Sequence, residues 1–214
     1  MLDKSIEFKN IIMKLENENV RNIDTPALPE GFSFRFFKNE DDIKHWARIE
    51  TSVLEFENEP DAEDYFIKAY LPYLNDLKQR CLFIENQEGI PIATTMAWFS
   101  DSELGHQAAL HWVSVDPRYQ GLGLGKSIVL KALSLFQELE PNQSIWLHTQ
   151  TWSHPAVCLY HKLGFNVVKK DLIATMNTRN GKGKIYPNDF EEAMVVLKKV
   201  MDEADVLKLF TSAV

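Results

Sequence analysis

A strand that runs into a glycine-rich turn and then into a helix is the feature that most restricts how this chain can fold. Residues 109–117, ALHWVSVDP, predict the strand, and residues 120–127, QGLGLGKS, are the densest glycine run of the sequence. Apolar residues at helical spacing follow to about residue 139, where Pro141 and Asn142 end the helix. Unpaired N–H groups and the positive end of the helix dipole then point at one place, which predicts an anion site.

Two familiar phosphate-binding patterns do not fit this turn. A GxxxxGK[ST] loop requires glycine five residues before Gly125, but that position is Gln120. The dinucleotide pattern GxGxxG also fails, because Gly121, Gly123 and Gly125 are evenly spaced. A nucleotide hydrolase of the Walker type therefore stays only a weak alternative.

The composition narrows the classes of partner. The chain has 214 residues, 45% of them hydrophobic and 25% charged, with a formal net charge of −8. This excess of acid argues against a nucleic-acid partner. The two cysteines, Cys81 and Cys158, have no disulfide or metal-ligand spacing, so we expect no metal and a reducing, cytoplasmic setting. We find no membrane span or export signal in the sequence.

Periodicity along the chain predicts one fold with two terminal additions. Residues 1–30 predict a helix and a connector, residues 31–177 the core, and residues 178–214 a loop and a helical addition packed on the same domain. In the core, the order β-α-α-β-β-β-α-β-α-β predicts a mixed, mostly antiparallel twisted sheet with helices on both faces. This is an α/β fold, classed as α+β in some schemes. The elements fall at 33–38, 41–56, 60–79, 81–86, 91–100, 109–117, 124–139, 144–150, 153–164 and 165–176. Helix is favoured from residue 189, with strand as the alternative for MVVLKKV, and NTRNGKGK predicts a polar loop.

Two motifs resemble those of the GNAT superfamily of N-acetyltransferases. The acyl-CoA-binding pattern Q/R-x-x-G-x-G/A is matched by Gln120, Gly123 and Gly125, after a Val-x-Pro lead-in at Val115 and Pro117. The second pattern, A-x-x-LY-x-x-x-GF, is matched by Ala156, Leu159, Tyr160, Gly164 and Phe165. The resemblance covers residues 108–168, with both motifs in the family's order, and it implies a GNAT-like fold.

The resemblance implies acetyl-CoA as co-substrate, in a gap where the strand with Val113 splays from the strand with Leu147. Backbone groups of Val113 and Val115 would bond the pantetheine, and amides from Gln120 to Lys126 would hold the pyrophosphate. The implied cofactor-binding residues are Val113, Ser114, Val115, Gln120, Gly121, Leu122, Gly123, Leu124, Gly125, Lys126 and Ser153. Arg118 and Lys126 would add positive charge. Gln120 replaces the commoner Arg, and Ser153 stands where the family often has Asn.

The implied reaction is direct transfer of the acetyl group to a bound amine. Tyr160 would be the general acid toward the CoA sulfur, and a backbone N–H near Val113 would polarise the carbonyl oxygen. His111 and His148 are candidates for the base, each also consistent with a structural role. Glu103 and the carboxylates of EFENEPDAEDYF (55–66) are further candidates that would act through water.

The sequence does not identify the acceptor amine or the oligomeric state. Small-molecule and peptide amines fit the resemblance equally, and residues 55–66 would suit a cation. Trp46, Trp98, Trp112 and Trp152 would wall a cleft or fill a core. The terminal segments are candidates for a homodimer interface. The alternative function is a non-catalytic module of the same fold that binds or senses acyl-CoA, although such a module would not need a phenol at the sulfur.

Overall fold

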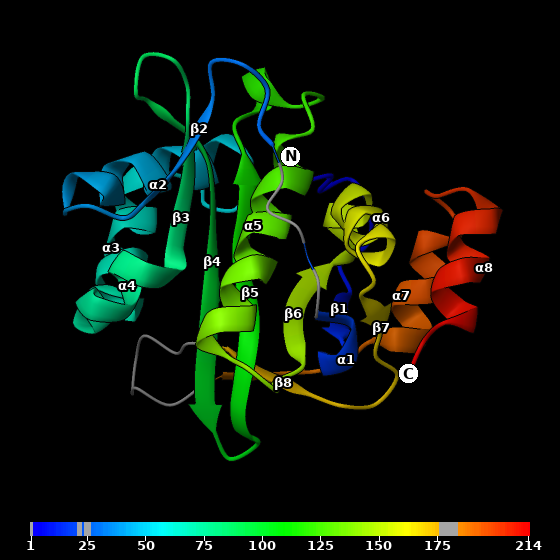
Figure 1. The fold of residues 1–214 in the computed structure, drawn as a ribbon. Coiled ribbons are helices and arrows are strands. Elements are labelled where there is room, and N and C mark those ends of the chain that lie inside the picture. The colour runs from blue at the N-terminus through cyan, green and yellow to red at the C-terminus, as the bar shows by residue number, and fades with distance from the viewer. Residues whose placement is uncertain (1, 21–22, 24–26, 176–183) are drawn as a thin grey trace.

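The computed structural model describes residues 2–20, 23, 27–175 and 184–214. Within them, a seven-stranded sheet has the order β2-β3-β4-β5-β6-β1-β7, as Figure 1 shows. Its neighbours are antiparallel except β5 and β6, which are parallel. The strands are β1 (Asn10–Leu15), β2 (Ser33–Phe36), β3 (Cys81–Glu85), β4 (Pro91–Ser102), β5 (Gly105–Val115), β6 (Ile145–Gln150) and β7 (Asn166–Val167). The predicted mixed, mostly antiparallel sheet is confirmed.

Helices cover both faces of the sheet because β3 and β4 are apolar on both. Leu82 and Ala97 belong to the core cluster under α5 (Leu124–Leu139). Phe83 and Trp98 point to the other face, where they join a second cluster with α2 (Asp41–Ser52), α3 (Glu59–Ala69) and α4 (Leu74–Arg80). Figure 1 shows these three helices on one side and α5 in front of β4 and β5.

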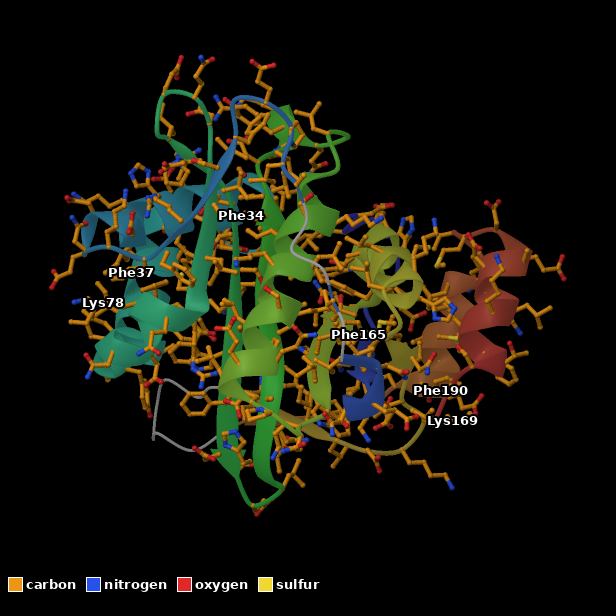
Figure 2. All side chains as sticks on the ribbon, viewed as in Figure 1. Phe34, Phe37, Lys78, Phe165, Lys169 and Phe190 are labelled. Carbon is orange, nitrogen blue, oxygen red and sulfur yellow. The ribbon has the colours of Figure 1, made fainter. Side chains whose placement is uncertain are left out.

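The remaining helices lie toward the β7 edge. They are α1 (Asn17–Val20), α6 (His154–Lys162), α7 (Phe190–Leu197) and α8 (Glu203–Thr211). Figure 2 labels Phe37 and Phe165, buried members of the two main clusters that lie toward opposite sides of the molecule. The helix favoured from residue 189 is confirmed in α7, so the strand alternative is wrong.

The helix predicted in the first segment is wrong, because residues 10–15 form strand β1. This strand lies between β6 and β7 and is antiparallel to both. Ile11, Met13 and Leu15 enter the main core cluster, whereas Ile12 enters a small cluster on the opposite face. A strand buried on both faces gives a continuous apolar run, which periodicity alone does not distinguish from a buried helix.

The strand predicted over residues 165–176 is also interrupted. Residues 166 and 167 form β7, and β8 (Ile173–Thr175) leaves the main sheet to pair with β9 (Lys184–Tyr186). Lysines 169 and 170 and Asp171 separate the two pieces, which ends the apolar run. The predicted polar loop NTRNGKGK lies outside the described residues except for Lys184.

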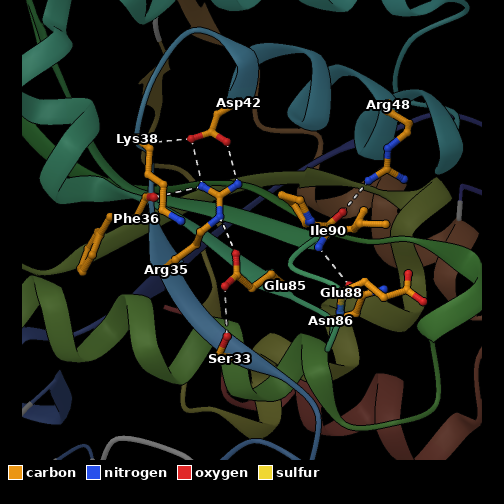
Figure 3. A network of polar contacts seen from close by, with 11 residues as sticks. Ser33, Arg35, Phe36, Lys38, Asp42, Arg48, Glu85, Asn86, Glu88 and Ile90 are labelled. Atoms are coloured by element: carbon orange, nitrogen blue, oxygen red, sulfur yellow. Dashed lines mark hydrogen bonds and ion pairs between the residues drawn. The ribbon is translucent and has the colours of Figure 1, made fainter.

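A partly buried ion-pair network fixes the start of α2 to the sheet (Figure 3). The guanidinium of Arg35 in β2 donates to both carboxylate oxygens of Asp42, at 2.9 and 2.6 Å, and its Nε donates to Glu85 at 2.8 Å. Asp42 also accepts from the backbone N–H of Lys38 at 2.7 Å. Such bidentate geometry fixes orientation as well as distance. The network therefore sets the direction of α2, which carries Glu50 toward the middle of the sheet.

Candidate active site

Strands β5 and β6 separate in the middle of the sheet. Their parallel pairing consists of Ala108 with Ile145 and Ala109 with Trp146, although β5 continues to Val115 and β6 to Gln150. Beyond these pairs, the facing edges of the two strands are free. The splay that the family resemblance implied is therefore present.

A β-bulge in β5 accompanies the separation. On β4, Met96 pairs with His111 and Thr94 with Ser114, so Trp112 and Val113 together face one residue. Trp112 has a φ of 53°, in the left-handed region that a bulky side chain rarely adopts. Strain of this kind, about 1–3 kcal/mol, persists only where surrounding contacts enforce it. The bulge turns the edge of Val113 toward the gap between the strands.

A groove begins at the end of β5 and extends along the glycine turn to the start of α6. Its lining contains almost all the residues that the motifs predicted, whereas the side chain of Leu122 lies outside it and is 49% exposed. The predicted residues in the lining are Val113, Ser114, Val115, Gln120, Gly121, Gly123, Leu124, Gly125, Lys126, Ser153 and Tyr160.

The glycine turn fits a phosphate group. Gly121 and Gly123 have φ values of 82° and 78°, and a Cβ on either would meet no protein atom within 4 Å. Helix α5 begins at Leu124, so its first N–H groups have no acceptor within the helix. The turn thus offers backbone donors on an open, side-chain-free surface, which suits a pyrophosphate.

The charges around the turn are distributed differently from the prediction. Lys126 lines the groove, but Arg118 does not, because its guanidinium pairs with Asp116 at 2.6 Å. The side-chain amide of Gln120 donates to the carbonyl of Val115 at 3.0 Å. This carbonyl is one of the groups expected to bond pantetheine, so Gln120 would have to release it when that arm binds.

The second motif forms the C-terminal cap of α6. The N–H of Phe165 donates to the carbonyl of Tyr160, and the N–H of Gly164 donates to that of His161, both at 3.0 Å. These two bonds, with Gly164 at a φ of 96°, make a Schellman motif. The Tyr160 and Phe165 rings pack edge to face with centroids 6.0 Å apart. The spacing in LYHKLGF therefore fixes the backbone of Tyr160.

The other end of α6 has no side-chain cap. Ser153 occupies the N-cap position, but its side chain makes no capping hydrogen bond. Its hydroxyl instead accepts a long bond, 3.4 Å, from the amide of Gln150. Pro155 lies in the first turn, and its fixed φ helps to start the helix.

A second cavity, of about 340 Å³, adjoins the groove and is lined by residues of both β5 and β6. The two share lining residues at their junction, which are Leu2, Glu55, Val113, Ser114, Ser153, Ala156 and Tyr160. Tyr160 is therefore exposed to both spaces. Burial, followed by the charges of Glu55 and Glu50, raises the pKa of its phenol, so the hydroxyl keeps its proton.

His111 lies in the second cavity within a hydrogen-bonded chain. Trp112 Nε1 donates to the Tyr70 hydroxyl at 2.7 Å, and this hydroxyl is 3.0 Å from Nδ1 of His111. The same hydroxyl also bonds Tyr65. Burial lowers the pKa of His111 to about 3. The imidazole is thus neutral and a weak proton acceptor at neutral pH, which argues against its predicted role as base.

His148 also lines the second cavity but is held in a structural contact. Its Nε2 is 2.9 Å from Oδ1 of Asn10, and its ring stacks on Tyr186 with centroids 4.0 Å apart. Burial and the positive charge of Lys184 lower its pKa to about 4. Like His111, it is a weak proton acceptor at neutral pH.

The carboxyl that sequence reasoning missed is Glu50. Its side chain is fully buried in the lining of the second cavity, and Ser114 Oγ donates to its Oε2 at 2.8 Å. Ile43, Trp46 and Glu50 lie on one face of α2 and are all buried. A glutamate at a core-facing helical position was therefore the available signal, because an ionisable group seldom occupies one without a function.

The remaining candidate carboxylates and tryptophans lie in different parts of the structure. Glu55 lines both spaces, whereas Glu103 lies exposed in the turn between β4 and β5. Trp46 and Trp98 are core residues with no exposed surface, while Trp112 and Trp152 line the second cavity. The four tryptophans thus divide evenly between the two roles left open by the sequence.

Comparison with known proteins agrees with this geometry. A family model described as the acetyltransferase (GNAT) family matches residues 40–165. A mycothiol acetyltransferase of Saccharomonospora viridis is 29% identical over 159 residues, covering 69% of this chain and 50% of that protein. An N-alpha-acetyltransferase of Sulfurisphaera tokodaii is 22% identical over 152 residues, covering 71% and 75%. The chain spans about half the length of the mycothiol acetyltransferases that it matches.

Solved structures share the fold. A GCN5-related N-acetyltransferase from Sphaerobacter thermophilus superposes with a TM-score of 0.57 at 15% identity, over 76% of this chain and 49% of that one. Among the described residues, none of the helices combines the length and apolar character that crossing a membrane would require.

Proposed function

Because the chain belongs to the GNAT family of acetyltransferases, we propose that it transfers an acetyl group from acetyl-CoA to a primary amine. The observation that supports this most directly is the junction at Tyr160, where the groove and the second cavity meet. Two substrates that enter from opposite sides would come together there. Direct attack within a ternary complex then needs no covalent intermediate on the protein.

The groove residues would bind and orient the co-substrate. Backbone donors from Gly121 to Lys126 would hold the pyrophosphate, and Lys126 would add charge. The edge of Val113 and Val115, which does not pair with β6, would bond the pantetheine amides as an added strand does once Gln120 releases the Val115 carbonyl. Acetyl-CoA, when bound, supplies the activated acyl group as a thioester.

Two groups of the chain would assist the transfer at the junction. The N–H of Val113 would donate to the carbonyl oxygen as negative charge develops on it. Tyr160 would give its phenolic proton to the sulfur as the C–S bond breaks. Burial raises the pKa of Tyr160, but the same surroundings disfavour the leaving thiolate, so the proton still has reason to move.

A Tyr160→Phe variant tests this assignment. Release of free thiol from acetyl-CoA across an amine panel should fall about 10²-fold or more, as for the loss of a general acid. Calorimetric affinity for acetyl-CoA should stay near that of the wild type. Unchanged turnover would remove Tyr160 from the role. Cys158→Ser, which changes a half-buried thiol on the same helix, is the matched control.

The alternative is a module of the same fold that binds or senses acyl-CoA without chemistry. Tight binding of acetyl-CoA with no acetylated product from any amine would support it. Binding of ATP without CoA would instead refute the acetyl-transfer proposal. A cytoplasmic setting, a homodimer through the terminal segments and the lack of nucleic-acid or membrane partners stay predictions.

A further inference from the structure

Two polar atoms in the second cavity lack a partner among the described residues. They are Oε1 of Glu50 and Nε2 of His111, both from side chains more than nine-tenths buried. Leaving such atoms unpaired in a buried place is costly, so each calls for a ligand group. A carboxylate accepts hydrogen bonds, and the free imidazole nitrogen donates or accepts according to its tautomer, so both atoms can bond the polar end of one small molecule.

We propose that Glu50 receives the acceptor amine and takes its proton, and that the second cavity admits a compact primary amine with one positive charge and an apolar body. This inference rests on the proposed acetyl transfer and identifies its substrate class. It adds Glu50 as a catalytic residue that neither motif contains. Its geometric basis is the position of Glu50 in the cavity beside Ser114, the strand neighbour of Val113.

The charges in the cavity point to Glu50 rather than to Glu55. Burial raises the pKa of Glu55, but a bond from Gln150 and the positive charge of Lys4 oppose that effect. Lys4 also lines the cavity, so its positive charge partly offsets the negative charge of Glu55. Glu50 has a bond from the neutral Ser114 hydroxyl, and its main charged neighbour is the like charge of Glu55. A single cationic amine would complete this arrangement.

The aromatic walls of the second cavity determine which body the acceptor carries beside its amine. Aromatic rings cover much of the lining, with Tyr65 5.3 Å from Trp112 and Phe8 4.9 Å from Trp152 between centroids. Such faces favour an apolar body and a nearby ammonium group. A polyamine would bring a second positive charge, but the other carboxyl of the cavity, Glu55, already has the positive charge of Lys4 near it. The acceptor class is therefore a compact amine such as phenethylamine, not a polyamine or a protein lysine.

The proton balance is simple. The ammonium form of the acceptor gives one N–H proton to Oε1 of Glu50, which becomes a neutral carboxylic acid. The nitrogen lone pair then forms the C–N bond as the C–S bond breaks, and Tyr160 protonates the sulfur. The second N–H proton, which the amide product does not keep, passes to the Tyr160 phenolate and restores the phenol, and Glu50 releases its proton to solvent. Burial and the charge of Glu55 hold the pKa of Glu50 well above its ordinary value, which favours the neutral pair of acid and amine. The other titratable groups facing the cavity include the neutral His111, His148, Tyr65 and Tyr70.

The experiment compares the wild type with Glu50→Gln. Glutamine keeps an oxygen for Ser114 but cannot take the proton. We expect kcat/KM for phenethylamine to fall about 10²-fold or more near neutral pH. The variant should regain activity as the pH rises toward the pKa of the free amine, because it can use only the neutral form. The wild type should reach its plateau at lower pH. Trifluoroethylamine, which is already neutral at pH 7, should react at similar rates with both proteins.

Matched measurements keep the outcomes distinct. Glu88→Gln changes an exposed glutamate in the β3–β4 turn and should leave the pH profile unchanged. Equal loss in Glu50→Gln at every pH, with no recovery on the neutral amine, would overturn the base role. Preference for spermidine or a peptide over phenethylamine would overturn the acceptor class. If acetyl-CoA itself failed to bind the wild type, the proposed function would fail, independently of Glu50.

Discussion

Replacing Gly164 with alanine tests how tightly the cap of α6 is built against the sheet. Gly164 has a φ of 96°, and a Cβ at this position would lie 3.1 Å from Cδ1 of Leu15 in β1. The backbone conformation alone costs an alanine about 1–2 kcal/mol. Leu15 is 1% exposed and packed in the core, so relieving the close contact should cost about 1–3 kcal/mol more.

The expected loss in the free energy of unfolding is thus about 2–5 kcal/mol. Urea denaturation at neutral pH measures it, provided that the unfolding transition is two-state. Gly89→Ala is the matched control, because Gly89 has a φ of 74° but no atom within 4 Å of its Cβ position. That variant should lose only about 1–2 kcal/mol.

The difference between the two variants isolates the contact between the new Cβ and Leu15. Equal losses for Gly164→Ala and Gly89→Ala would refute it. In a protein that already carries Leu15→Val, Gly164→Ala should lower the free energy of unfolding by less than it does in the wild type. Valine shortens the side chain that the new Cβ meets. Since the same cap fixes Tyr160, Gly164→Ala should also reduce turnover in the fraction that stays folded.

Two further predictions concern the glycine turn and the α2 network. Gly123→Ala should weaken acetyl-CoA binding in calorimetry, because Gly123 has a φ of 78° and the new methyl group would face the groove. Gly125→Ala should weaken binding less, because its Cβ would meet the side chains of Val115 and Leu159 at the ordinary contact distances of 3.7 and 3.8 Å. Arg35→Met should cost about 3–5 kcal/mol at neutral pH, because it leaves Asp42 buried without its partner. Burial raises the pKa of Asp42, but the bonds from Arg35 and Lys38 outweigh that effect and lower it. The stability they contribute is present above about pH 4 and lost as the pH falls through the lowered value, so the gap between the two proteins should narrow in acid.

The groove could be predicted from the sequence because its determinants are local. A glycine turn, a helix start and a C-terminal cap each depend on residues a few positions apart, so Gly123 and Gly164 were identifiable from spacing, whereas Tyr160 came from the family resemblance. The splay of β5 and β6 followed from the family resemblance. The Schellman geometry now gives the physical reason for the spacing between Tyr160 and Gly164.

The second cavity could not be predicted in the same way, because residues distant in sequence build it. Phe8, Glu50, Trp112 and Tyr186 come from four separate segments that meet only in the folded sheet. The place of β1 was hidden because its pairing with β6 is non-local and both of its faces are buried. His111 and His148 line this cavity and were candidates in the sequence, but nothing local showed that they meet. Glu50 left a trace as an acid on the buried face of α2.

The position of β1 has a consequence for the order of folding. Asn10 pairs with Gln150 and Met13 with Val167, so this early strand can enter the sheet only after most of the chain has emerged from the ribosome. Such non-local pairing is slow to form, and an apolar strand that waits for it is exposed to aggregation. Leu2 and Phe8 precede β1; Leu2 lines both spaces, and Phe8 lines the second cavity. The glycine turn and the cap of α6 can therefore form early, but both spaces are complete only after β1 has paired with β6 and β7.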